Sequence, residues 1–110
     1  MFTFFDEYDL LELFNAEPIT TGPEGTGLYI YSKNNSNGVK IVLSLSAHEH
    51  KCSISLGIDG VSFFQVELKN VEYLRRKDGY LRIHQSNSDD DYSICFYPEF
   101  FFRIGDDRPV

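Results

Sequence analysis

Basic residues are scarce in this chain. Its 110 residues include ten Lys and Arg against 17 Asp and Glu, which gives a formal net charge of −7. Nucleic acids and anionic membranes both require basic protein surface, so the shortage argues against direct binding to either. An acidic balance suits a basic protein partner, and it also serves plain solubility. Composition alone leaves both readings open.

Cysteine and long apolar runs are also lacking. The two cysteines, Cys52 and Cys95, are fewer than a small secreted scaffold normally carries, and a buried thiol is the expected role for each. Residues 1–20 have no basic start followed by an apolar run, so we expect no signal peptide. No apolar stretch is long enough to span a membrane. We therefore expect a reduced, cytoplasmic protein.

Apolar and aromatic residues, by contrast, are plentiful. They include ten Phe and seven Tyr, and 42% of the chain is hydrophobic. This content is typical of a globular protein and not of a disordered one. The length fits a single domain covering residues 1–110.

The first segment, residues 3–16, predicts an amphipathic helix. Thr3 followed three residues later by Asp6 resembles a capping box, and Pro18 ends the segment. A short strand around residues 10–14 is the competing interpretation. The apolar residues recur at helical spacing: Phe4, Phe5, Tyr8, Leu11 and Phe14.

From residue 28 onward the hydrophobic pattern changes to period two, which indicates strands. Asn37-Gly38, Asp59-Gly60 and Asp78-Gly79 mark tight turns. Short connections make antiparallel neighbours. We predict an α+β fold: a strongly bent antiparallel sheet or half-barrel of about seven strands, with one N-terminal helix on one face. The expected strands are 28–32, 39–45, 52–58, 61–68, 71–75, 80–84, 92–97 and 100–104.

Two segments suggest metal binding. On a strand, His48, His50 and Cys52 would share one face, and such residues can bind zinc. No spacing rule supplies a fourth ligand, so a polar turn that enters a strand is the favoured interpretation. The run Asp89–Asp91 lacks the alternating ligands and the glycine turn of a calcium loop. We expect no metal and no other cofactor.

His84 is the one candidate for a general base on a strand, because its free pKa lies near neutrality. No nucleophile motif accompanies it, and the glycines form no phosphate-binding or dinucleotide fingerprint. These observations predict a protein that is not an enzyme.

Charge is unevenly distributed along the chain. Residues 1–32 contain six acidic and no basic residues, and residues 85–110 contain six acidic and two basic ones. The central residues 33–84 contain eight basic residues against five acidic ones. If the two ends pack together, they make one acidic face that would speed encounter with a basic partner. The alternative is a solvated helix face and a charged hairpin tip, unrelated in space.

Two segments carry a family resemblance: the acidic stretch FFDEYDLLELF (residues 4–14) and the strand-turn-strand SISLGIDGVSFFQVEL (residues 53–68). Across its whole length the chain resembles the immunity proteins of bacterial contact-dependent growth inhibition and related polymorphic toxin systems. The resemblance implies a cognate toxin, often a basic nuclease, that is held inactive by tight one-to-one binding.

The leading hypothesis is therefore a cytoplasmic immunity protein whose partner is a protein toxin domain. A ligand-binding or enzymatic β half-barrel, with His84 or residues 48–52 on its concave side, is the alternative. Self-association through the aromatic residues 100–102 is a third possibility. The charge pattern picks the expected contact residues: Asp6, Glu7, Asp9, Glu12, Asp89, Asp90 and Asp91.

Overall fold

The computed structural model describes residues 4–20, 28–86, 91–96 and 100–104, and these residues form one α-helix and ten β-strands in two sheets. In the first sheet, here called the meander sheet, the strands lie side by side in sequence order and each pair is antiparallel. Its strands are β2 (Ile19–Thr20), β3 (Leu28–Asn34), β4 (Val39–Ser46), β5 (Lys51–Ile58) and β6 (Val61–Leu68).

The second sheet, here called the terminal sheet, has the order β1-β7-β8-β9-β10. Its first strand pairs parallel to β7, with Phe4 opposite Tyr73 and Phe5 opposite Leu74, whereas the other pairs are antiparallel. Its strands are β1 (Phe4–Phe5), β7 (Val71–Lys77), β8 (Tyr80–Gln85), β9 (Asp91–Cys95) and β10 (Phe101–Ile104).

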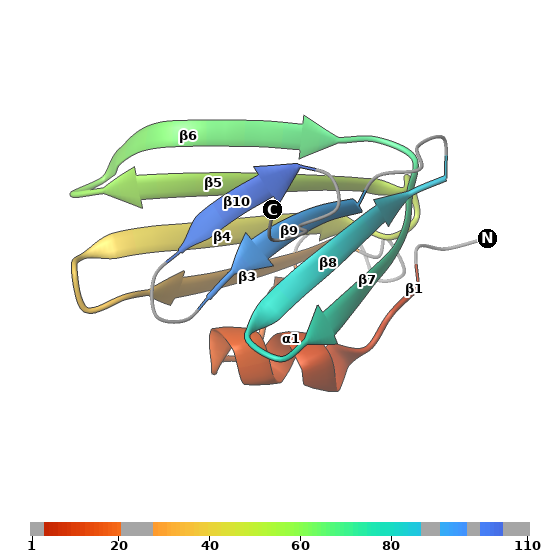
Figure 1. The fold of residues 1–110 in the computed structure, drawn as a ribbon, viewed down its shortest axis with the longest axis horizontal. Coiled ribbons are helices and arrows are strands. Elements are labelled where there is room, and N and C mark those ends of the chain that lie inside the picture. Colours follow the sequence, from red (N-terminus) through yellow and green to blue (C-terminus); the bar gives the residue numbers. More distant parts are fainter. Residues whose placement is uncertain (1–3, 21–27, 87–90, 97–99, 105–110) are drawn as a thin grey trace, which may run out of the picture.

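The core lies between the two sheets, which Figure 1 shows stacked with their strands crossing at an angle. Every second residue of β4 points inward, so that Ile41, Leu43 and Leu45 are fully buried. They form one cluster with inward residues of the terminal sheet such as Leu81 and Ile83. Burying each such side chain contributes about 1.5–3 kcal/mol, so this cluster is the main source of stability.

The tight turns follow the local chemistry. Asp59 (φ 52°) and Gly60 (φ 79°) both occupy the left-handed region, as a two-residue hairpin turn requires. Gly38 (φ 81°) and Asp78 (φ 56°) take the same region at two other predicted turns. The predicted strands between these turns are confirmed, and β6 has the predicted bounds.

The helix, α1 (Glu7–Phe14), is shorter than predicted. The prediction that it starts at residue 3 is wrong, because Phe4–Phe5 pairs with β7 as a strand and Asp6 is the N-cap. It ends at Phe14, with Asn15 in the left-handed conformation as the C-cap, three residues before Pro18. The competing strand at residues 10–14 is also wrong, because Leu10, Leu13 and Phe14 form the buried face of the helix.

The helix lies along one side of the two-sheet stack and contacts β3 of one sheet and β7 of the other (Figure 1). The predicted α+β class, with a bent antiparallel sheet that does not close and an N-terminal helix, is confirmed. The sheet is divided into two five-stranded layers in the described residues, and short β1 and β2 add to the predicted strands. The described helix is too short and too polar to cross a membrane.

Candidate protein-binding surface

Helix α1 distributes its acidic residues over its start and two flanks. Asp6 accepts a hydrogen bond from the backbone N–H of Tyr8 (2.8 Å), which is the usual role of an aspartate at an N-cap. Glu7 and Asp9 follow in the first turn, where the helix dipole favours negative charge. At helical spacing, Asp9 and Glu12 fall on one flank and Glu7 on the other, with the buried face between them.

One flank is joined to the terminal sheet by Arg76. Its Nη2 lies 3.1 Å from Oε2 of Glu12, and its Nε lies 3.8 Å from Oδ1 of Asp9. The backbone N–H of Arg76 also donates to Oδ2 of Asp9 (3.4 Å). Two of the predicted contact acids are therefore already paired with a basic residue from the far half of the chain.

The outer side of the β7–β8 hairpin carries a stack of three side chains. The rings of His84 and Tyr73 are parallel to within 17° at 4.9 Å, and the Arg75 guanidinium carbon lies 4.4 Å from the Tyr73 centroid. Asp91 of β9 joins the end of this stack, with Oδ1 only 2.6 Å from Nδ1 of His84. The pair is half-buried and holds the imidazole in one orientation.

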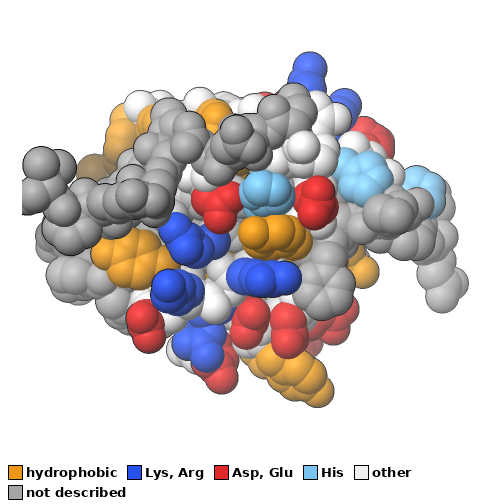
Figure 2. Space-filling model, turned by 45° about the vertical axis from the view of Figure 1, so that its right-hand side comes forward, with side chains coloured by type: hydrophobic (Ala, Val, Ile, Leu, Met, Phe, Trp, Pro, Cys, Tyr) orange, Lys and Arg blue, Asp and Glu red, His pale blue; other side chains and the backbone are white. Residues whose placement is uncertain are grey.

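Together these residues make a charged face. A small hollow of about 220 Å³ on it is lined by Tyr73 and Arg75 of the stack, by Asp91 and by further basic side chains. Figure 2 shows Lys and Arg side chains gathered near the middle of the view, with Asp and Glu side chains around them. We use the name charged face for one set of residues: Asp9, Glu12, Tyr73, Arg75, Arg76, Lys77, Arg82, His84 and Asp91.

The charged face brings together parts of both acidic chain ends. Asp9 and Glu12 lie on one side of the basic hairpin and Asp91 on another, so the combined surface has mixed charge. Glu7 points to the other flank of α1, and Asp89 and Asp90 lie outside the described residues. The role of all seven acids in partner binding stays a prediction.

Sequence reasoning missed the basic side of this face. The alternation of β7 and β8 was a usable signal, because Tyr73 and Arg75 point outward from one strand and Arg82 and His84 from its partner. Arg76 and Asp9 of α1 are 67 residues apart in the sequence, and no local sequence pattern predicts a contact between them.

The zinc interpretation of residues 48–52 is wrong in its geometry. His48 and His50 lie in a turn before β5, and the φ of 58° at His50 turns the chain there. Cys52 faces the core and is 1% exposed, and burial raises the pKa of its thiol to about 12. Within the described residues, no group of three His, Cys, Asp or Glu side chains is placed to hold a metal ion.

The enzymatic and self-association alternatives gain no support from the site. The His84–Asp91 pair orients an imidazole, but it supplies no nucleophile. Phe100 is half-buried, and its ring packs edge-on against Phe96 at 5.8 Å, so it is used within the fold. The side chains of residues 101 and 102 lie outside the described part of the chain.

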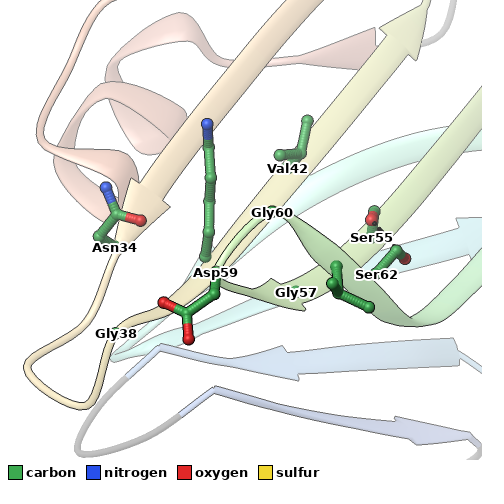
Figure 3. Close-up of a pocket in the computed structure, with 10 residues that line it drawn as sticks. Asn34, Gly38, Val42, Ser55, Gly57, Asp59, Gly60 and Ser62 are labelled. Carbon is green, nitrogen blue, oxygen red and sulfur yellow. Dashed lines mark hydrogen bonds between the residues drawn. The ribbon is translucent and has the colours of Figure 1, made fainter.

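A second, shallow hollow of about 480 Å³ lies at the tips of the meander sheet (Figure 3). Its lining includes Lys40, Asp59 and Ser55, together with Gly57 at a bulge where β5 and β6 shift register. A Cβ at Gly57 would lie 2.9 Å from the carbonyl oxygen of Val61, so glycine is required there for the strands to approach. The mixed lining points to no particular ligand.

Comparison with known proteins gives one informative match. No protein-family model matches the chain, and no curated protein is similar to it in sequence. Among solved structures, the fold is similar to that of a chain from the contact-dependent growth inhibition toxin–immunity protein complex of Klebsiella pneumoniae 342. The TM-score is 0.78 at 17% sequence identity, and the alignment covers 96% of this chain and 98% of that chain. The two chains share a fold over nearly their whole lengths.

Proposed function

We propose that this chain is an immunity protein that binds and neutralises a cognate toxin domain in a one-to-one complex. The observation that carries the proposal is the end-to-end fold similarity to a chain of a toxin–immunity complex, at a TM-score of 0.78. The same class of system is the one that the sequence resembles across its whole length. Two independent lines of reasoning therefore lead to one function.

The charge of the chain supports the immunity role over the toxin role. A nuclease toxin must present positive surface to its nucleic-acid substrate. This chain has a net charge of −7, which opposes nucleic-acid binding and complements such a toxin. The chain has only two cysteines, Cys52 and Cys95, and both are buried. So few cysteines fit the cytoplasm, where an immunity protein would meet its toxin, better than a small secreted scaffold.

The mechanism that we propose is electrostatic guidance followed by occlusion. Acidic side chains steer the basic toxin into contact and then cover the surface on which its substrate would lie. The expected contacts are Asp6, Glu7, Asp9, Glu12 and Asp89–Asp91. Asp9 and Glu12 are partly neutralised by Arg76, so Glu7 is the helix acid whose charge is least compensated by the described contacts.

Co-expression with the candidate toxin tests the proposal. We expect the toxin to be the C-terminal domain of a large secreted protein whose gene lies immediately upstream, and the probe is that domain, produced in a bacterial host with and without this chain. We expect growth to stop with the domain alone, to recover with both, and to be normal with this chain alone. The two proteins should co-purify at a one-to-one mass in light scattering.

A toxin domain of another sequence type is the control, and this chain should not protect against it. Growth arrest by this chain alone would assign it the toxin role and overturn the proposal. Failure of the pair to co-purify, together with failure to restore growth, would also overturn it. The rate constant for association of this chain with the toxin domain should fall at least tenfold from low to high salt, as for other electrostatically steered complexes.

A further inference from the structure

A groove separates α1 from the edge of the meander sheet. It is a hollow of about 460 Å³ with α1 on one side, the segment after the helix at its end, and β3 on the other side. This size falls in the range of roughly 300–1,000 Å³ that is common for ligand sites. The lining residues used below are Glu7, Tyr8, Leu11, Glu17, Tyr29 and Tyr31.

The inner wall of the groove contains an unmet hydrogen-bonding group. Tyr31 is 1% exposed, and its hydroxyl oxygen is buried with no hydrogen-bond partner among the described residues. Its ring packs against Phe14 at 5.3 Å, so the side chain is held in place. A buried polar group without a hydrogen-bond partner lowers the stability of the folded protein and therefore needs an explanation. One explanation is that the hydroxyl forms its hydrogen bond with a bound partner molecule.

The hydroxyl keeps its proton and is available as a donor. Burial, and then the nearby Glu7 carboxylate and Tyr29, raise the pKa of Tyr31 to about 12. A neutral phenol donates one hydrogen bond, and a backbone carbonyl of a bound chain is a suitable acceptor.

The outer walls of the groove are acidic and apolar. Glu7 and Glu17 are exposed at the groove, and its lining residues include no Lys or Arg in the part of the chain that the structure describes. Tyr8 is 76% exposed and Leu11 36%, and Ile19 on the adjoining edge strand is 64% exposed. Apolar surface and two carboxylates in one groove suit a side chain with an aliphatic stem and a cationic head.

We propose that this groove receives an arginine-bearing segment of the toxin, an inference that rests on the function proposed above. The guanidinium pairs with the carboxylates of Glu7 and Glu17, and its stem packs on Tyr8 and Leu11. The Tyr31 hydroxyl is covered in the free protein, so binding must shift the groove wall enough for a backbone carbonyl of the same segment to accept its hydrogen bond. Arginine fits better than lysine, because its planar fork pairs with carboxylates and stacks on tyrosine rings.

Toxin binding by single variants tests the groove, with affinity measured by calorimetry on the complex. Tyr31→Phe removes only the hydroxyl and should weaken binding about tenfold, in line with the loss of one buried hydrogen bond. Its thermal midpoint should be equal to or above that of the wild type, because the free protein loses an unmet polar group. Unchanged affinity in Tyr31→Phe would assign the hydroxyl no role in binding.

The carboxylates are tested in the same way. Glu7→Gln and Glu17→Gln should each weaken binding about five- to tenfold and lower its dependence on salt. Glu67→Gln is the matched control, since Glu67 is exposed on β6 at the opposite edge of the meander sheet. If wild type binds the toxin and the groove variants behave like Glu67→Gln, the groove inference fails and the immunity function stands.

A free peptide separates the two proposals when the toxin does not bind at all. The probe is acetyl-Gly-Arg-Gly-amide at millimolar concentration, observed through amide chemical shifts of this protein. Shifts in α1 and β3 that disappear in Glu7→Gln would retain the groove as a site for an arginine side chain of another partner. No shifts in a protein that also fails to bind the toxin would overturn both proposals.

Discussion

The two flanks of α1 carry the same kind of charge in different settings. On the flank that faces β7, Arg76 forms ion pairs with Asp9 and Glu12, and these two ion pairs link the helix to the terminal sheet. On the flank that faces β3, Glu7 borders a groove whose lining includes a second carboxylate, Glu17. Net charge in sequence therefore overstates the charge that is available to a partner, because part of it serves the fold.

The difference also extends to the polar groups beneath the two flanks. Arg76 satisfies its acids through a backbone and two side-chain contacts, whereas the Tyr31 hydroxyl under the other flank has no partner among the described residues. A surface with satisfied groups gains little from a new contact, and one with an unmet donor gains more. We infer that Asp9 and Glu12 on the first flank serve the fold as well as the partner, and that the second flank contributes more to recognition.

Leu10→Ala should have the largest effect, because it removes the anchor that both flanks share. Leu10 is 1% exposed and belongs to the core cluster, and truncation of a leucine at such a site costs about 3 kcal/mol. Urea unfolding measures this loss. Leu11→Ala, on the exposed side of the same helix, is the control and should cost well under half as much.

Arg76→Glu should have an intermediate effect, because it turns the paired flank into a cluster of three acids. We expect a loss of about 1 kcal/mol in urea unfolding, a modest value because these side chains are partly exposed and screened. Adding Glu12→Arg should recover part of the loss. If Lys77→Glu, the same charge change one residue along the strand, costs as much as Arg76→Glu, the pairing contributes nothing specific.

The smallest expected effect is a loss of folding stability at alkaline pH, and it depends on the hydroxyl of Tyr31 beneath the groove flank. The folded protein holds the Tyr31 proton more tightly than the unfolded chain does, since its pKa is raised from 10.0 to about 12. The resulting stability is present below pH 10 and is lost as the pH rises through 12. Wild-type stability should therefore fall more steeply than that of Tyr31→Phe between pH 10 and 12.

The Cys52 thiol also makes the folded protein less stable as the pH rises, because its pKa is raised from 9.0 to about 12. Both proteins contain Cys52, so its contribution cancels in the comparison. Parallel pH curves for wild type and Tyr31→Phe would contradict the buried setting of the hydroxyl.

Much of the fold was predictable because its determinants are local. Asp59-Gly60 and Asp78-Gly79 specify turns through backbone conformations that few other residues tolerate, and period-two patterns identify the strands between them. The start of α1 was not predictable in the same way. Phe4 and Phe5 continue the helical spacing of apolar residues, but their strand pairing with β7 is set by residues about 70 positions away.

The candidate site shows the same division. Exposure of Glu7 and Glu12 follows from helical spacing, and the pairing of Glu12 with Arg76 does not. The unmet hydroxyl of Tyr31 was equally out of reach, because strand alternation predicts burial of its ring but says nothing of partners for its oxygen. Such contacts depend on how two sheets and a helix pack together.

The position of α1 between β3 and β7 has a consequence for synthesis. The strands of the meander sheet pair with their sequence neighbours, so this sheet can assemble while the chain is still emerging. The other strand against which the helix packs, β7, begins only at Val71, and a ring that packs against Phe14 belongs to Phe96. The buried face of the helix therefore remains partly uncovered until these later residues have been made. The nascent chain therefore passes through a stage in which the helix exposes apolar side chains on an incompletely folded protein. We expect chaperones to matter most at that stage.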